Sequence, residues 1–248
     1  VGNTSSYNQP QLVSSIGRVK HISAGSTHSI AITSDAKLYT WGRNNAGQLG
    51  LGSSESKRKP TIVGNDSNWV DCSAGGEHSL FLNTQGQLFS CGSNSNGQLG
   101  LAHNEDQNKL QSVSSSAQWK MIKAGGDFSM ALDTNGFLYS WGGNSQGQLG
   151  LGDKQDKNTP QLISGKTRWE KVSVCTEHVL AIGNKNDLYS WGRNDSRQLG
   201  YEGSGSTKPQ LVDDQNSWKD IAAGQSHSIA LAIQCDVSDT LYEVVTCG

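Results

Sequence analysis

The 248-residue sequence predicts an all-β fold, a β-propeller whose four-stranded blades are each about 50 residues long. Three observations predict it. Two short strings recur with a fixed period, large apolar and small residues alternate within each unit, and the chain holds 30 glycines but only 4 prolines. Because glycine supplies the positive φ that tight turns need, this composition indicates many short strands joined by turns.

The first recurring string, Gly-Gln-Leu-Gly, occupies residues 47–50, 97–100 and 147–150, and returns as Arg-Gln-Leu-Gly at 197–200. The second string, whose commonest form is Ala-Gly-x-x-His, keeps the same register and begins at Ala24, Ala74, Ala124, Val174 and Ala223. Such a period indicates one unit that is repeated and that buries its apolar face only against its neighbours. We therefore predict a single propeller segment, residues 1–248, with repeat boundaries near 1–50, 51–100, 101–150, 151–200 and 201–248.

Each unit carries the signals of four strands in a fixed order. A first strand led by tryptophan precedes the Ala-Gly string, and an alternation of apolar and small residues, as at 129–132, predicts the second. A turn such as Asn135-Gly136 then leads into a third strand, as at 138–141. The fourth strand is led by proline and is predicted at residues 10–13, 60–63, 160–163 and 209–212.

The residue types also predict where each strand lies in its blade. Because proline has no N–H to donate, the proline-led strand is expected at the outer edge, and the crowded strand that carries the Ala-Gly string is expected innermost. Arg197 takes a turn position that glycine holds in the first three units. If that position is left-handed, Arg197 destabilises the turn by on the order of 1 kcal/mol.

Charge, hydropathy and cysteine count exclude several classes of protein. The longest apolar stretch, residues 229–233, is far shorter than a membrane-spanning helix, so no membrane insertion is expected. With 20 Lys+Arg against 22 Asp+Glu, the chain lacks the basic field of a nucleic-acid binder, so nucleic acid is not expected as the main ligand. Five cysteines without CxxC spacing indicate neither a disulfide framework nor a zinc site, which favours an intracellular location, cytoplasmic or nuclear.

The repeat resembles that of the regulator of chromosome condensation family. The residues that carry the resemblance are Leu-Tyr-Ser-Trp-Gly at 138–142, then Asn144, then Gly-Gln-Leu-Gly-Leu-Gly at 147–152, with near-copies along the whole chain. Kelch repeats have a similar period, but their Gly-Gly pairs find no consistent counterpart. The resemblance implies a propeller of seven blades, of which five are present. Both ends then lie inside a repeat, so we expect a segment of a longer chain.

The fifth unit differs from the others in length. It carries about seven extra residues in the stretch 234–241. We predict a lengthened hairpin loop there, and such an insertion is a candidate contact surface.

The residues just before the recurring histidine are the main candidates for binding a partner: Thr27, Glu77, Asp127, Glu177 and Ser226. Because each unit is one blade, these side chains are predicted to lie around one face, near the central channel. Three consecutive carboxylates would there form an acidic rim that docks a basic partner surface. The alternative is that they are polar loop residues that only solvate that face.

Two further groups of residues have a competing structural interpretation. Lys57 and Arg58 are candidates for partner binding in a loop before an outer strand, with an ordinary solvated loop as the alternative. The recurring histidines are predicted to be structural and to bond the backbone of a neighbouring blade, since Phe128 stands in the same position in the third unit. The recurring tryptophans are predicted to pack between blades.

No nucleophile, phosphate-cradling or metal-ligating pattern occurs in the sequence, so no catalytic residue, cofactor or metal is predicted. The predicted function is a non-catalytic protein–protein interaction propeller, a scaffold or regulatory module that binds other proteins through its loop faces. The resemblance implies an alternative, a guanine-nucleotide exchange factor for a small GTPase. Exchange needs only a face that binds the nucleotide-free GTPase better than the nucleotide-bound form. Glu77 and Asp127 are the residues that we would test for it.

Overall fold

The computed structural model describes residues 5, 7–13, 15–235 and 240–248, which form nineteen strands and no helix. The first blade holds β1 (Val19–Ala24), β2 (His28–Thr33), β3 (Leu38–Gly42) and β4 (Lys57–Ile62); the second holds β5 (Trp69–Ala74), β6 (His78–Asn83), β7 (Leu88–Gly92) and β8 (Gln107–Ser112). The third holds β9 (Trp119–Ala124), β10 (Phe128–Asp133), β11 (Leu138–Gly142) and β12 (Lys157–Leu162); the fourth holds β13 (Trp169–Val174), β14 (His178–Gly183), β15 (Leu188–Gly192) and β16 (Ser206–Asp213). The fifth holds β17 (Ser217–Ala223), β18 (Ser228–Cys235) and β19 (Thr240–Cys247).

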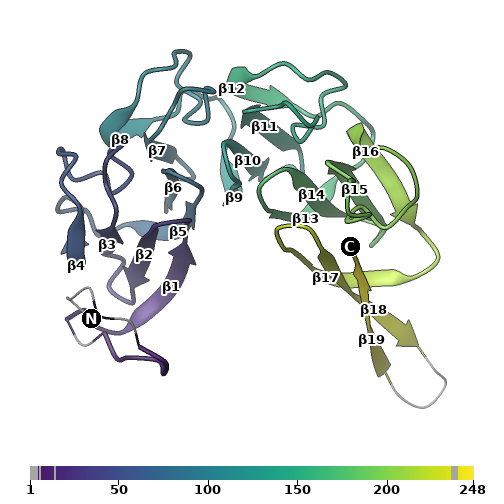
Figure 1. Ribbon diagram of the computed structural model, residues 1–248, viewed down its shortest axis with the longest axis horizontal. Coiled ribbons are helices and arrows are strands. Elements are labelled where there is room, and N and C mark those ends of the chain that lie inside the picture. Colours follow the sequence, from purple (N-terminus) through teal and green to yellow (C-terminus); the bar gives the residue numbers. More distant parts are fainter. Residues whose placement is uncertain (1–4, 6, 14, 236–239) are drawn as a thin grey trace.

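Each blade is an antiparallel sheet whose strands follow one another in chain order. The first four sheets have four strands and the fifth has three in the part of the chain that the structure describes. The blades lie side by side in an arc, with β4, β8, β12 and β16 on the periphery and the first strand of each blade toward the centre (Figure 1). The all-β propeller fold is thereby confirmed, as are the outer position of the proline-led strand and the inner position of the strand that ends in the Ala-Gly string.

The core lies between blades rather than within them. Ile30 and Leu38 of the first blade pack with Trp69 and Phe81 of the second, and the next interfaces repeat this arrangement with equivalent residues. One face of each blade therefore covers the opposite face of the next, as a repeat architecture requires.

The recurring tryptophans of the third strands add a hydrogen bond to this packing. The indole Nε1 of Trp141 donates to the Gln98 carbonyl oxygen at 2.9 Å, and that of Trp191 donates to the Gln148 carbonyl oxygen at 2.9 Å. Both acceptors belong to the preceding blade. The prediction that these side chains pack between blades is confirmed.

The position of Arg197 is left-handed, with a φ of 59°, where Gly47 and Gly97 have 88° and 81°. The cost of about 1 kcal/mol expected for a non-glycine residue at a left-handed position therefore applies to Arg197. The turn accepts a non-glycine residue because the Arg197 N–H still bonds the Asn194 carbonyl oxygen at 3.0 Å, as the glycines do in the other blades.

The outer strands differ from the prediction in extent. They begin three residues before the proline, because the residue there pairs with the end of the third strand, as in Gly42 with Lys57. Lys57 and Arg58 therefore lie on β4 and not in a loop, so that prediction was wrong. Residues 10–13 were also predicted as a strand, but they form none, since no described strand lies beside them to complete a ladder.

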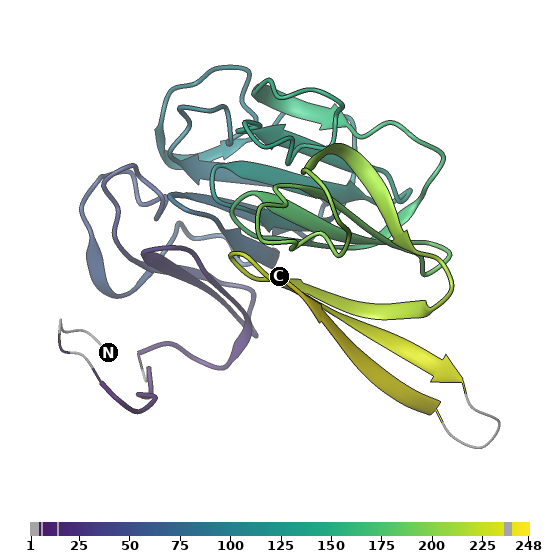
Figure 2. The ribbon, with the colours of Figure 1, turned by 45° about the vertical axis from the view of Figure 1, so that its right-hand side comes forward.

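The extra residues of the fifth unit lengthen the second and third strands of its blade. Strands β18 and β19 each have eight residues and stay in register up to the pair Cys235 and Thr240. Figure 2 shows this two-stranded ribbon projecting from the rest of the molecule. Within the predicted loop over 234–241, residues 234, 235, 240 and 241 therefore belong to the strands, and residues 236–239 lie outside the described residues.

Candidate functional site

Two sets of loops gather on one face of the arc. The inner loops join the first and second strands of each blade and comprise residues 25–27, 75–77, 125–127, 175–177 and 224–227. Those of the first four blades line a shared hollow of about 300 Å³ around the centre. The outer loops join the third and fourth strands and contain the Gly-Gln-Leu-Gly string.

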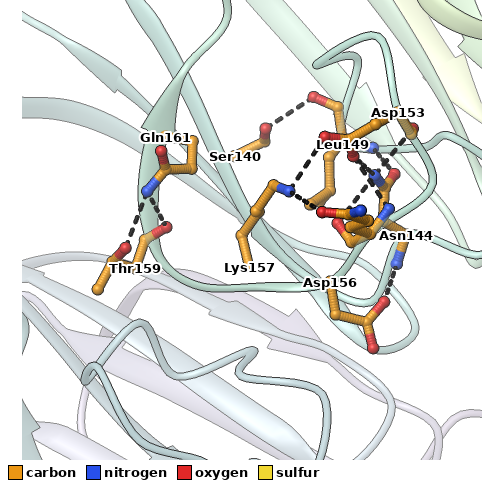
Figure 3. A network of polar contacts seen from close by, with 9 residues as sticks. Ser140, Asn144, Leu149, Asp153, Asp156, Lys157, Thr159 and Gln161 are labelled. Carbon is orange, nitrogen blue, oxygen red and sulfur yellow. Dashed lines mark hydrogen bonds and ion pairs between the residues drawn. The ribbon is translucent and has the colours of Figure 1, made fainter.

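A buried asparagine organises each outer loop. In the third blade the Asn144 side-chain oxygen accepts from the Leu149 N–H at 3.0 Å, while its nitrogen donates to the carbonyl oxygens of Asp153 at 3.0 Å and Gln155 at 3.1 Å (Figure 3). The Ser140 hydroxyl closes the network by donating to the Leu149 carbonyl oxygen at 2.7 Å. Asn44, Asn94 and Asn194 make the equivalent bonds in their own blades. The outer loops are therefore held in place by side chains and not only by turns.

Replacing Asn144 by alanine is expected to lower the free energy of unfolding by about 2–4 kcal/mol, because a buried N–H and two carbonyl oxygens lose their partner together. Chemical denaturation followed by tryptophan fluorescence measures this loss. Asn158→Ala is the matched control, since its half-buried side chain bonds one side chain among the described residues, that of Asn104. Equal stability of the two variants would contradict a structural role for Asn144.

The recurring histidines join neighbouring blades through a serine. The Nε2 of His28 lies 2.8 Å from the Ser79 hydroxyl of the next blade, and that of His78 lies 2.9 Å from the Ser129 hydroxyl. His178 and Ser228 form the same pair at 3.0 Å. The prediction of a structural role is supported, but the partner is a side chain of the next blade and not its backbone.

The protonation of these histidines follows from the second bond of each serine. Ser79 donates its hydroxyl proton to the Gln48 carbonyl oxygen at 2.8 Å, so the hydrogen between Ser79 and His28 must come from the imidazole Nε2. The Nδ1 of His28 is buried without a partner among the described residues. Burial lowers the pKa of His28 and His178 to about 4 and that of His78 to about 3, so all three are neutral near pH 7.

The five residues that the sequence singled out do lie on the inner loops, at the end of the first four and one residue before the end of the fifth. Thr27 and Ser226 are exposed neutral residues at the two ends of the series. The three carboxylates between them differ in their partners. Glu77 is paired with Arg43 at 3.3 Å and Glu177 with Arg193 at 2.6 Å, whereas Asp127 has no cation within ion-pair distance among the described residues.

Asp127 borders a cavity of about 210 Å³ between the third and fourth blades. The carboxylates of Asp156 and Glu177 also line it, together with Gln148 and the backbone of Gly143. Burial, and next the charges of Glu77, Asp156 and Glu177, raise the pKa of Asp127. The site can therefore offer negative charge and hydrogen-bond acceptors to a cationic group. Sequence reasoning found Asp127 and Glu177 but not the roles of Asp156, Gln148 and Gly143. Gln148 belongs to the recurring Gly-Gln-Leu-Gly string, which was interpreted only as a turn, and nothing in the pattern placed Asp156 or Gly143 beside Asp127.

Lys57 and Arg58 lie apart from this cavity, on the outer strand of the first blade. Lys57 pairs with Glu55 at 2.7 Å on the surface. Neither residue lines the cavity. The structure does not join them to the acidic residues in one site.

The described residues offer neither a metal cluster nor a membrane-spanning helix. No group of three or more His, Cys, Asp or Glu side chains there could hold a metal ion. No helix there is long and apolar enough to cross a membrane.

Comparison with known proteins gives a consistent result. The family model described as RCC1-like domain matches residues 1–176, and the regulator of chromosome condensation (RCC1) repeat matches residues 185–231. Among curated proteins, a segment of 60 residues is 47% identical to the human E3 ubiquitin-protein ligase HERC2, over 22% of this chain and 1% of HERC2. A segment of 56 residues is 39% identical to the ultraviolet-B receptor UVR8 of Arabidopsis thaliana, over 22% of this chain and 13% of that receptor.

Solved structures share the fold at low sequence identity. Human WBSCR16 superposes with a TM-score of 0.79 at 22% identity, over 87% of this chain and 61% of its own. Prp20p of Saccharomyces cerevisiae, described with its binding to Gsp1p and histones, superposes with a TM-score of 0.67 at 19% identity, over 87% of this chain and 71% of its own. The chain thus spans less than two thirds of WBSCR16 and small parts of the curated relatives.

Proposed function

This chain belongs to the RCC1-like domain family, and from that premise we propose that it is a non-catalytic interaction propeller that binds other proteins through the loop face around Asp127. The observation that carries the proposal is the Asp127 carboxylate, which pairs with no described cation and lies beside a cavity lined also by Asp156 and Glu177. A rigid scaffold with an unneutralised acidic face is suited to a basic protein surface. The proposal includes an intracellular location, cytoplasmic or nuclear.

The hydrogen-bond networks of the loops support this proposal because they hold the binding face rigid. Asn144 fixes the outer loop that forms one wall of the cavity, and the Asn144 N–H itself holds the Asp156 carboxylate at 2.8 Å. The inner loops are tied from blade to blade, as by the Gly126 N–H to the Cys175 carbonyl oxygen at 3.2 Å. A partner would meet a surface that needs little ordering, and this limits the entropic cost of binding.

A second candidate is nucleotide exchange on a small GTPase. The observation that favours it is the structural likeness to Prp20p, which is described as binding Gsp1p. We infer from this likeness that the partner of the present chain could be a protein of the same class as Gsp1p. Exchange would require the acidic inner loops to bind the nucleotide-free partner more tightly than its nucleotide-bound form. Glu77 and Asp127 are the residues in this chain that would carry the difference.

The variant Glu77→Gln with Asp127→Asn tests the proposal. We expect it to lose partner capture while its stability stays within about 0.5 kcal/mol of the parent, because the Arg43 pair is exposed and Asp127 pairs with no cation in the part of the chain that the structure describes. Affinity purification from cells followed by mass spectrometry, with and without a chelator that strips nucleotide, measures capture. Asp66→Asn with Glu105→Gln removes the same charge from exposed positions away from the cavity and should capture normally.

The outcomes separate the two candidates. A single small GTPase that is enriched only after nucleotide is stripped would favour exchange. A fixed set of partners that does not depend on nucleotide would favour a scaffold. Undiminished capture by the Glu77 and Asp127 variant would contradict binding through this face.

A further inference from the structure

One position of the repeat controls the charge on the loop face. It is the residue after the glycine that ends each third strand, and it reads Arg43, Ser93, Gly143 and Arg193 in the first four blades. Where this residue is arginine, its guanidinium is bonded to an inner-loop carboxylate: Arg43 to Glu77 at 3.3 Å and Arg193 to Glu177 at 2.6 Å. The chain thus shows twice what the acidic inner loops bind when a cation is supplied.

The third blade supplies none. Gly143 has no side chain, and the space beside it is the cavity of about 210 Å³ that Asp127, Asp156 and Glu177 line. The nearest arginine of the fourth blade, Arg193, is already occupied by Glu177 and Asp195. The cavity therefore combines room, negative charge and the absence of a cation among the described residues.

A buried amide also points to a ligand here. Gln148 lines the cavity and is only 4% exposed. Its side-chain oxygen accepts from the Gln146 N–H at 2.9 Å, but no described residue accepts from its side-chain nitrogen. In the second blade the equivalent nitrogen of Gln98 donates to the Ser93 hydroxyl at 3.4 Å, and that hydroxyl is what Gly143 lacks. The nitrogen itself is not fully buried, so it is open to the cavity and can donate to an acceptor that a ligand brings.

From these observations we infer that the cavity beside Gly143 receives an arginine side chain from a partner protein, with its guanidinium against Asp127 and Asp156. The partner's backbone carbonyl oxygen accepts from the Gln148 side-chain nitrogen. This inference rests on the proposed function and names the group that the loop face recognises. Arginine fits better than lysine because its planar fork can bond two carboxylates at once, as Arg193 does with Glu177 and Asp195.

The test uses three short peptides as probes, acetyl-Gly-Ala-X-Ala-Gly-amide with arginine, lysine or citrulline at X. Binding to the isotope-labelled chain at low ionic strength is followed by NMR through the side-chain signals of Gln148 and Asp127. We expect the arginine peptide to move both signals, and the citrulline peptide, which has the same shape without charge, to bind at least about tenfold more weakly. Weaker binding of the lysine peptide is also expected.

The decisive variant is Gly143→Arg, which would fill the cavity with a side chain of this protein itself. Gly143→Arg is expected to fold, because Gly143 is not in the left-handed region and an added Cβ would lie 3.3 Å from its nearest neighbour, the Asp127 carbonyl oxygen. Its own guanidinium should occupy the site, weaken the arginine peptide by about tenfold or more and lower the pKa of Asp127. Gly143→Ala makes the same backbone change without a cation, and Asp66→Asn removes one distant charge; both should bind within about twofold of the parent.

Three results would overturn the inference: equal binding of the arginine and citrulline peptides, equal binding of the arginine and lysine peptides, or unchanged binding in Gly143→Arg. These failures are distinct from failure of the proposed function. If Gly143→Arg still captures a cellular partner that the Glu77 and Asp127 variant loses, the loop face binds proteins but the arginine site is wrong.

Discussion

Between pH 7 and pH 5 the protein is expected to lose about 2 kcal/mol of unfolding free energy for each of its three buried histidines, His28, His78 and His178. The reason is that each imidazole is held neutral between two blades. In the unfolded chain a histidine has a pKa near 6.5, whereas burial lowers it to about 4 for His28 and His178 and to about 3 for His78. The stabilisation is complete above pH 6.5 and is lost as the pH falls from there toward 4.

Urea unfolding at a series of pH values measures this loss. The matched variant is His78→Phe with Ser129→Val, which copies the apolar pair that Phe128 and Val179 form one blade further on. Its pH dependence should be about one third smaller than that of the parent, since one of three histidines is gone. An equal pH dependence would contradict the account. Burial raises the pKa values of Asp71 and Asp127, so these two groups stabilise the folded state as the pH falls, opposite to the histidines. The difference between variant and parent therefore isolates the histidine contribution better than the parent's total pH dependence does.

The period of the sequence was enough to predict the blades. In the first four blades, strand alternation placed the second and third strands to within a residue, because the second strands are almost wholly buried and the third strands mostly so. In the fifth blade β18 (Ser228–Cys235) runs beyond the predicted 228–231. The outer strands were misplaced because half of their residues face solvent, as in β4, where the pattern carries little information about where pairing begins. Residues 10–13 have the same sequence signal as β16, yet pairing depends on a neighbouring strand that the signal cannot supply.

The candidate site was predictable in its charges but not in its shape. Asp127 and Glu177 could be found because they precede a recurring histidine. The cavity could not be predicted, because it results from the absence of a side chain at Gly143. The meaning of this glycine becomes visible only in the structure, where Arg43 and Arg193 at the equivalent positions bond the inner-loop carboxylates Glu77 and Glu177. The histidine partner was missed for a related reason. Ser79 and Ser129 lie 51 residues from their histidines and were interpreted only as small residues of a strand.

The third histidine position offers the sharpest test of how blades are joined, since Phe128 stands there and Val179 stands where the next blade would place the serine. Both side chains are fully buried. Phe128→His is expected to lower the free energy of unfolding by about 2–4 kcal/mol, because the imidazole would be buried against Val179 with no hydroxyl to bond. Val179→Ser alone is expected to destabilise as well, by leaving a buried hydroxyl beside an apolar ring.

Together the two substitutions are expected to restore most of the lost stability. The new serine would find the Gln148 carbonyl oxygen, which already accepts from Trp191. The second blade shows that one carbonyl oxygen can serve both donors, since Gln98 accepts from Ser129 at 2.7 Å and from Trp141 at 2.9 Å. A double-mutant cycle by urea unfolding should therefore give a coupling of about 2 kcal/mol or more between positions 128 and 179. Additive losses would show that the histidine and serine do not act as a unit. Between pH 7 and pH 5 the doubly substituted protein should also lose about 2 kcal/mol more unfolding free energy than the parent, because it has one more buried histidine.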